Sequence, residues 1–403
     1  MLALLGGMLL TKGCARRPVT ASVDPLRDEV ARELARTKGV GMACAIAGPG
    51  RVWWSDGFGL ADVGHQRPML ADTLINVASV SKTVTATAVM QLWEQKRFDL
   101  QGDVARHLPF PLRNPHFPDV PITFEQLLTH RSSIRDNGPA YDRTYVCGDS
   151  QVALGEWLKE YFTPGGVYWG EDNWHQWPPG TANPPPEPQT YSNVGFGVLG
   201  YLVELLGRRP FPALCREGIF DPLGMRYTGW LLRDIDVTRH ATPYLHVPDH
   251  MTAEEVAFYG PLAAPGRDLK SVSPGTLVPL RPYGYANYPD GSLRTSANEL
   301  ARFLAAYLAQ GQAYGSRLLE PSTLALMFSG NHFGGHLCWG TRTLPDGRSV
   351  ILHSGADAGV SSVIAFESSS RVGVVCVRNF KVAKEDNTRL ITLLLDAGRR
   401  IGG

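Results

Sequence analysis

The chain of 403 residues lacks an excess of charge of either sign. Lysine and arginine together number 39, aspartate and glutamate 38, and the formal net charge is +1. Proteins that bind nucleic acid through its phosphates concentrate positive charge on one face or in one segment. The composition therefore predicts a protein with no nucleic-acid partner.

Hydrophobic runs long enough to cross a bilayer are also lacking. The candidate targeting segment, Met1–Leu10, is too short to span a membrane and resembles a truncated secretory signal. The dipeptide Gly13-Cys14 resembles a bacterial lipidation site. We expect residues 1–22 to be a signal-like or flexible N-terminus and residues 23–403 to form one domain. The expected destination is the periplasm or a lipid anchor at Cys14, with membrane attachment through the N-terminus alone; a cytoplasmic protein is the alternative.

The six cysteines include no Cys-x-x-Cys pair. Zinc sites and thioredoxin-like redox sites usually rely on such pairs, so we expect neither a metal nor another cofactor. The cysteines after Cys14 are expected to be buried thiols without a disulfide framework. The sequence also lacks Gly-x-Ser-x-Gly, the turn that carries the nucleophile of α/β-hydrolases, which excludes that fold.

Apolar runs near both ends of the chain are typical of strands. The first two are joined at Gly48-Pro-Gly50, which predicts a hairpin. The expected strands are 40–47, 52–59, 336–344, 349–353, 360–367 and 372–377.

Helical patterns dominate the middle of the chain. Residues 76–95 contain no breaker and are apolar nearly all round, which is typical of a buried helix. The expected helices are 76–95, 124–129, 194–206, 297–310 and 386–399, with Ser296 as an N-cap. Residues 136–189, rich in Trp, Tyr, Gly and Pro, are expected to form a loop-dominated wall of a cleft.

These elements predict an α+β fold. An antiparallel sheet is built from the N- and C-terminal strands and is flanked by helices. A mostly helical region is inserted between them, at about residues 84–300.

Ser79 and Lys82 are the first candidate catalytic residues. At a spacing of three on a helix they project from the same face, so the amine can reach the hydroxyl. A serine becomes a good nucleophile when a base takes its proton, and a lysine can do so if burial or nearby cations lower its pKa. Because Lys82 lies in a largely uncharged stretch, a functional reason for its charge is expected.

Two later clusters could complete such a site. Tyr191 and Asn193 lie between a Pro-rich loop and an apolar helix, so Tyr191 could relay a proton and Asn193 could bind a substrate amide or Lys82. His353 and Gly355 lie at the end of an expected strand, where the histidine could offer a donor or a positive charge and the glycine could let a substrate backbone lie alongside. A capped helix start and a structural histidine are the alternatives.

In this order, Ser-x-x-Lys, Tyr-x-Asn and His-x-Gly resemble the serine β-lactamase and DD-peptidase superfamily, in particular its class C β-lactamase, DD-carboxypeptidase and esterase branch. The segments 57–62, 127–130, 221–225 and 291–295 resemble landmarks of the same family. The resemblance spans about residues 40–377.

The resemblance implies roles for residues of this sequence. Ser79 is the acylated nucleophile, Lys82 its base and Tyr191 the proton relay. The implied substrate-binding residues are Asn193, His353, Gly355 and Ala356, and the backbone amides of Ser79 and Ala356 form the oxyanion hole.

A serine hydrolase that acts on a small ester or a peptide-like amide is the expected function. A β-lactamase is the alternative enzyme, and a penicillin-binding receptor or an inactive scaffold is the non-enzyme alternative. The motif His353-Ser-Gly stands where class C β-lactamases usually have Lys-Thr-Gly, which favours the esterase or DD-carboxypeptidase type. The long insert before Tyr191 reshapes the cleft and makes a transfer of substrate by analogy unsafe.

Overall fold

The computed structural model describes residues 24–181, 191–329, 336–382 and 384–402. The expected signal-like segment and the lipidation site at Cys14 lie outside the described residues, so they stay predictions. Among the helices that are described, none has the length and hydropathy needed to cross a membrane.

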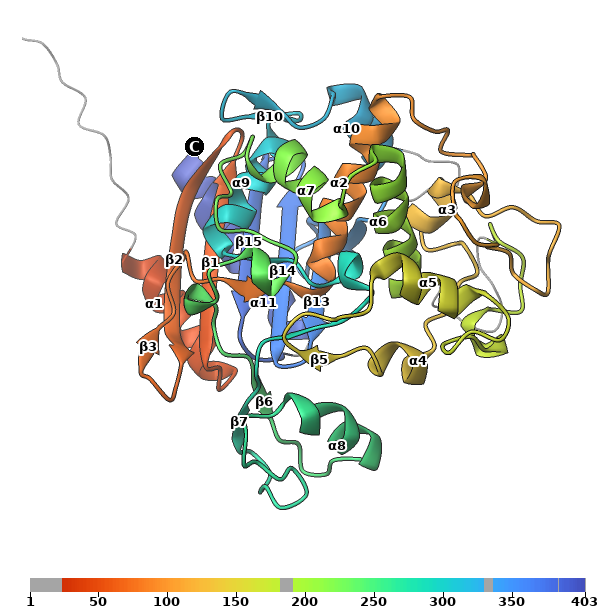
Figure 1. The fold of residues 1–403 in the computed structure, drawn as a ribbon. Helices are drawn as coiled ribbons and strands as arrows, with labels where there is room; N and C mark the ends of the chain where they lie inside the picture. The colour runs from red at the N-terminus through yellow and green to blue at the C-terminus, as the bar shows by residue number, and fades with distance from the viewer. Residues whose placement is uncertain (1–23, 182–190, 330–335, 383, 403) are drawn as a thin grey trace, which may run out of the picture.

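A seven-stranded antiparallel sheet forms the centre of the protein (Figure 1). Its strand order is β12-β13-β14-β15-β1-β2-β3, and β1 pairs with β15 from Met42 opposite Arg378 onward. The sheet therefore joins the two ends of the chain, as the sequence predicts. The strands are β1 Gly41–Gly48, β2 Arg51–Asp62, β3 Arg67–Pro68, β12 Gly340–Thr343, β13 Ser349–Asp357, β14 Val360–Glu367 and β15 Val372–Arg378.

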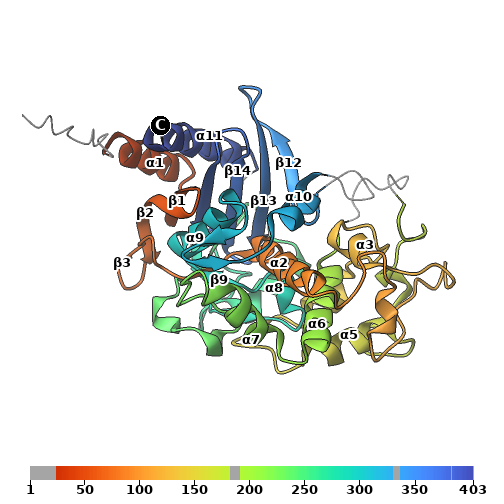
Figure 2. The ribbon, with the colours of Figure 1, turned by 90° about the horizontal axis from the view of Figure 1, so that it is seen from above.

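Strand β1 is apolar throughout because it is buried on both faces. Met42, Cys44 and Ile46 face one hydrophobic core, and the intervening alanines, Ala43 and Ala45, face another. The first core lies under helices α1 (Asp24–Arg36) and α11 (Lys384–Gly402), and helix α9 (Ala297–Leu308) covers the opposite face (Figure 2). Ser296 caps α9, as predicted, by accepting a hydrogen bond from the Glu299 N–H at 3.1 Å.

The region between β2 and β12 carries most of the helices. Their bounds are α2 Ser81–Glu94, α3 Phe124–Leu128, α4 Gly138–Asp142, α5 Leu154–Phe162, α6 Asn193–Gly207, α7 Phe211–Cys215, α8 Ala253–Tyr259 and α10 Pro321–Ser329. Short strands pair between them as β4 Ile75–Asn76 with β9 Arg294–Thr295, β5 Val146–Cys147 with β8 Tyr283–Gly284, β6 Tyr244–His246 with β7 Leu277–Pro279, and β10 Gln312–Ala313 with β11 Ser316–Arg317. Helix α8 and the β6–β7 pair project from the body of the molecule (Figure 1).

The segment expected to be loop-dominated contains two of these helices. Trp157 and Tyr161 on α5 are completely buried, so these aromatic side chains pack into the core and do not line a cleft wall. Bulky aromatic burial of this kind supplies a large share of core stability.

The expected helix at 76–95 begins later than predicted. Asn76 ends β4, residues Ala78–Val80 form a single 3₁₀ turn, and α2 starts at Ser81. Ala78 has φ of +46°, which a right-handed helix does not allow, and its N–H donates to the Asn76 side chain at 2.7 Å. Ser79 therefore lies in the turn that leads into the helix.

Two further boundaries differ from the prediction. Strand β12 begins at Gly340 because the backbone N–H groups of Leu337 and Cys338 donate to Met327 and Leu128, outside the sheet. Strand β13 continues to Asp357, so the His-x-Gly motif lies inside a strand. Helix α1 was not predicted at all.

We expect Leu304→Ala to lower the free energy of unfolding by about 2–5 kcal/mol, because truncating a buried leucine leaves a cavity. Leu304 on α9 is completely buried and packs against the backbone of Gly373 in β15. Urea unfolding measures the change. Leu70→Ala is the matched control, since Leu70 is 59% exposed and a surface truncation changes stability by roughly 0.5 kcal/mol or less. Equal midpoints for the two variants would contradict the packing of α9 on the sheet.

Candidate active site

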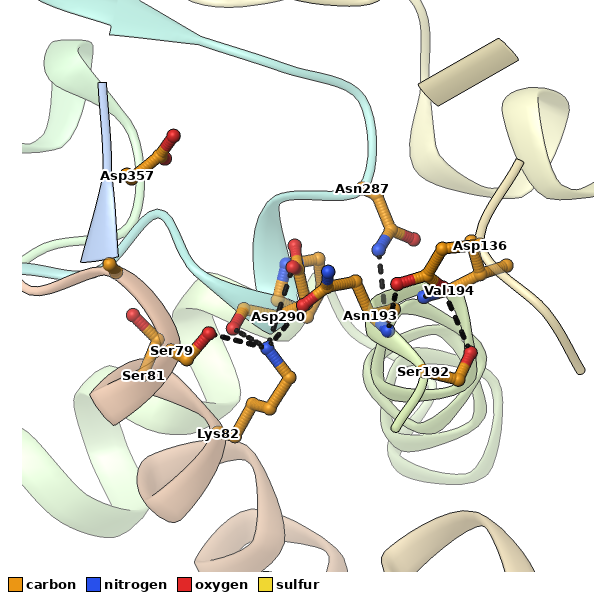
Figure 3. Close-up of polar contacts among 12 residues, drawn as sticks. Ser79, Ser81, Lys82, Asp136, Ser192, Asn193, Val194, Asn287, Asp290 and Asp357 are labelled. Carbon is orange, nitrogen blue, oxygen red and sulfur yellow. Dashed lines mark hydrogen bonds and ion pairs between the residues drawn. The ribbon is translucent and has the colours of Figure 1, made fainter. Parts of the chain in front are cut away.

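Ser79 and Lys82 are in direct contact. The Lys82 Nζ donates a hydrogen bond to the Ser79 Oγ at 3.1 Å (Figure 3). The 3₁₀ turn runs straight into α2, so the spacing of three still places both side chains on one side of the chain. The contact expected from the sequence is therefore present, although the serine precedes the α-helix.

Two other segments complete the surroundings of the Lys82 ammonium. It donates to the Asn193 Oδ1 at 2.7 Å and to the backbone oxygen of Asp290 at 2.7 Å. The Asp290 carboxylate lies 3.5 Å away, and the Lys82 side chain has no exposed surface. Of the two interpretations of Asn193 from the sequence, the contact with Lys82 is the one the structure contains.

The pKa of Lys82 is raised, so the condition named for a lysine base, a pKa lowered by burial or by nearby cations, is not met in this state of the site. Desolvation lowers this pKa, but the nearby Tyr191, Asp290 and Asp136 raise it more. Burial alone does not lower this pKa below its usual value, because acidic side chains from distant parts of the chain lie close to Lys82.

Tyr191 lies over Lys82, with the Nζ 5.0 Å from the centre of the phenol ring. The ring stacks on His130 at a centroid distance of 4.2 Å, and 40% of the residue is exposed. Desolvation raises the pKa of the Tyr191 phenol, and the Lys82 ammonium opposes this rise. Burial lowers the pKa of His130 well below its usual range, and its Nδ1 accepts from the Ser192 N–H at 3.1 Å. A neutral His130 thus holds the loop that carries Tyr191.

Asp136 anchors the start of α6, a role that the sequence analysis missed. Its carboxylate accepts from the Ser192 hydroxyl at 3.0 Å and from the N–H groups of Asn193 at 2.8 Å and Val194 at 3.0 Å. A carboxylate is favourable at a helix N-terminus, where backbone N–H groups lack partners within the helix. Together with Asn287, which donates to the Asn193 backbone oxygen at 2.9 Å, Asp136 fixes the position of the Asn193 side chain.

Strand β13 presents a free edge beside Ser79. The Leu344 N–H donates to the Arg348 oxygen at 2.7 Å where β12 turns into β13, and hydrogen-bonded positions of an antiparallel pair recur at every second residue. The backbone groups of Leu352, Ser354 and Ala356 therefore point to the same side of β13. The first residue of β12, Gly340, pairs with Leu352. The backbone groups of Ser354 and Ala356 lie beyond this pair, so they face an edge that no described strand covers.

Gly355 is buried and faces the turn that carries the serine. A Cβ at this position would lie 2.5 Å from the Val77 oxygen and 2.9 Å from the Ser79 nitrogen. From the sequence, this glycine is predicted to let a substrate backbone lie alongside the strand. The structure supplies another reason, since the lack of a side chain lets β13 approach the backbone of Ser79.

His353 is neutral in this environment. Desolvation and the Lys82 ammonium lower its pKa to about 3, and its Nδ1 lies 3.0 Å from the Ser354 carbonyl oxygen. A carbonyl can only accept, so the ring proton is assigned to Nδ1 and the Nε2 is left as an acceptor. The expectation of a donor or a positive charge from His353 is therefore corrected to a neutral acceptor.

A cavity of about 480 Å³ opens above these groups. Its walls come from the serine turn, from the loops before α4 and α6, and from the edge of the sheet: Ser79, His130, Tyr191, Cys338–Arg342 and Leu352–Ser354. The cavity brings together Ser79, Tyr191 and His353. Gly355 and Ala356 follow directly along β13. In the described part of the chain, no group of three or more His, Cys, Asp or Glu side chains is placed to hold a metal ion.

The family model named Beta-lactamase matches residues 26–399. The bovine serine beta-lactamase-like protein LACTB (Bos taurus) is 32% identical over 30% of this chain and 22% of its own length. Esterase EstB of Burkholderia gladioli is 29% identical over 56% of this chain and 55% of its own. The chain thus spans about a fifth and about half of these two relatives.

A solved structure shares the same fold over nearly all of its length. The beta-lactamase/D-alanine carboxypeptidase of Pseudomonas syringae matches with a TM-score of 0.66 and 19% identity, covering 93% of this chain and 99% of that one. At this identity the likeness shows the fold alone. The antiparallel sheet with its flanking helices is confirmed as the expected β-lactamase-like architecture.

We expect Gly355→Ala to slow covalent labelling of Ser79 by a fluorophosphonate at least about 10²-fold, the cost of a misplaced oxyanion donor. The new methyl group would push against the Val77 oxygen and the Ser79 nitrogen. The measurement is the labelling rate, with a check that the variant is folded. Gly260→Ala is the control, because a Cβ there meets open space. Equal rates for both variants would contradict the close approach of β13 to Ser79.

Proposed function

The chain belongs to the Beta-lactamase family, and on this premise we propose that it is a serine hydrolase that forms an acyl-enzyme at Ser79 and acts on a small ester or a peptide-like amide. One observation carries this proposal. The fully buried Lys82 Nζ lies 3.1 Å from the Oγ of Ser79, and Ser79 lines a cavity. A buried amine in contact with a serine hydroxyl is the arrangement that nucleophilic catalysis requires.

The chemistry follows from the positions of the groups. The Ser79 Oγ attacks the substrate carbonyl and its proton passes to Lys82. The N–H groups of Ser79 and Ala356 stabilise the oxyanion in this proposal. It is supported by the position of Ser79 in the turn that leads into a helix and by the free edge of β13 that Ala356 faces. Tyr191, above Lys82, relays a proton to the leaving group. Water then hydrolyses the acyl-enzyme.

The motif His353-Ser-Gly favours an ester or amide substrate over a β-lactam. β-Lactam antibiotics carry a carboxylate, and a lysine at position 353 would offer it a positive charge. His353 is neutral, with a pKa of about 3. Arg342 lies in the cavity wall, and its Nη1 donates to the Thr388 hydroxyl at 3.1 Å, so part of that guanidinium is already engaged. The relative named an esterase, EstB, supports the same choice.

β-Lactam hydrolysis is the alternative activity, since the Pseudomonas syringae protein that shares this fold is named a beta-lactamase/D-alanine carboxypeptidase. A penicillin-binding receptor or an inactive scaffold is the non-enzyme alternative. These functions differ in the fate of an acyl group on Ser79. A hydrolase releases it and turns over, a receptor keeps the covalent adduct, and an inactive scaffold forms no adduct.

We expect steady hydrolysis of a short-chain aryl ester to exceed that of a chromogenic cephalosporin, with D-Ala-terminated peptides as a third substrate class. Ser79→Ala should reduce ester hydrolysis at least about 10³-fold, because the nucleophile is lost. Steady-state kinetics on the purified protein measure both.

Each other outcome has a defined meaning. Faster cephalosporin turnover would replace the esterase assignment by the β-lactamase one, and a stoichiometric burst without turnover would favour the receptor. Full activity in Ser79→Ala would overturn the proposal, provided that mass spectrometry confirms the substitution.

A further inference from the structure

Asp290 is a buried carboxylic acid beside the catalytic lysine. It ends the 3₁₀ turn Tyr288–Asp290 and is 2% exposed. Its Oδ2 lies 3.5 Å from the Lys82 Nζ and accepts from the Tyr141 hydroxyl at 2.8 Å. Its Oδ1 is buried and has no hydrogen-bond partner among the described residues. A buried oxygen without a hydrogen-bond partner is costly in free energy, which indicates a functional role for this carboxyl.

The groups around Asp290 are mostly acidic or neutral. They include one cation, Lys82 on α2, and two further carboxyls, Asp136 and Asp357. Four phenols from three segments complete the set: Tyr141, Tyr145, Tyr191 and Tyr285. Desolvation raises the pKa of Asp290 to about 7, opposed by the Lys82 ammonium and the Tyr141 hydroxyl. Asp290 can therefore hold or release a proton near neutral pH.

Lys82 alone is a poor base in this structure. Its pKa is raised, so at neutral pH it carries a proton and has no lone pair for the proton of Ser79. The 3.5 Å separation from Asp290 offers a route that needs no proton exchange with solvent. The N–H that donates to the Asp290 backbone oxygen at 2.7 Å turns to the carboxylate of the same residue, 3.5 Å away. That N–H bond breaks and an O–H bond forms on Asp290, which converts a buried ion pair into a neutral pair. Burial disfavours charge, so a closely balanced pair of this kind is physically reasonable.

We propose that Asp290 is a positioning residue that holds the proton given up by Lys82, so that the neutral amine can accept the proton of Ser79. The inference rests on the proposed acyl-enzyme function. During acylation the Ser79 O–H bond breaks as its oxygen bonds to the substrate carbonyl carbon, and the N–H bond of Lys82 forms again. Lys82 then gives this proton to the leaving group through Tyr191, as an N–H bond of Lys82 breaks. The O–H bond of Asp290 breaks last, and its proton restores the Lys82 ammonium and the Asp290 carboxylate.

The decisive measurement is the acid limb of the pH profile of kcat/KM, which is the fall of kcat/KM as the pH is lowered. Its position is the pH at which kcat/KM has fallen to half of its maximum. In the wild-type protein the limb reflects the uptake of a second proton by the Lys82–Asp290 pair. In Asp290→Asn the amide keeps the size of the side chain and cannot take a proton, so Lys82 must lose its own to solvent. We expect the limb to move to higher pH by at least about one unit. At a pH on the acid side of the wild-type limb, this shift lowers kcat/KM about tenfold.

Companion variants separate this role from a structural one. Asp142→Asn, on the same helix as Tyr141 and exposed, removes a neighbouring carboxyl and should leave the limb in place. Asp290→Glu restores a carboxyl and should return the limb towards its original position. Tyr141→Phe keeps Asp290 and removes its hydroxyl donor, which raises the pKa of Asp290 and should shift the limb upward by less. This variant serves as the test if Asp290→Asn does not fold.

Two results would overturn the inference. One is a limb that stays in place in Asp290→Asn, or in Tyr141→Phe where the first variant is unfolded. The other is a limb that moves to lower pH, which would mean that Asp290 only raises the pKa of Lys82. Neither result touches the proposed function, which fails separately if Ser79→Ala retains activity.

Discussion

The positive charge of Lys82 is held with no exposure to water, and the surrounding segments are arranged by that constraint. A buried ammonium is costly unless each of its protons has a partner. The partners are the Ser79 Oγ, the Asn193 Oδ1 and the Asp290 backbone oxygen, which come from three separate parts of the chain. Removing any one of them would leave a buried N–H unpaired, so the same contacts that stabilise the charge also fix the position of the Ser79 hydroxyl.

The same requirement extends outward to residues that never touch Lys82. Asn193 can accept from the lysine because Asp136 caps the start of α6 and Asn287 holds the Asn193 backbone. On the opposite side, the bare backbone of Gly355 lets β13 lie against the serine turn. The sheet therefore contributes a free backbone edge and the helical region contributes the proton-transfer groups. Neither part of the fold contains a complete site by itself.

Much of this arrangement could be predicted from the sequence, for physical reasons that differ between residues. Ser79 and Lys82 are three positions apart, and any helical turn brings such a pair together. The doubly buried strand β1 is recognisable from its continuous apolar run. The start of α2 could not be predicted, because it depends on the positive φ of Ala78 and on a hydrogen bond from its N–H to Asn76. The direction of the pKa shift of Lys82 could not be predicted from the sequence either, because only the tertiary fold brings Asp136 and Asp290 close to the Lys82 ammonium.

Protonation connects these observations to the choice of substrate. Three carboxyls, Asp136, Asp290 and Asp357, have raised pKa values because burial disfavours their charged forms. His353 is kept neutral by the same desolvation and by the nearby ammonium. The neutral forms of these carboxyls are therefore favoured more than those of exposed carboxyls, and His353 supplies no positive charge to bind an anionic substrate group. Such surroundings support the proposed choice of a neutral ester or amide carbonyl. The charge of such a substrate appears only in the transition state, where the proposed donors are the N–H groups of the serine turn and of β13.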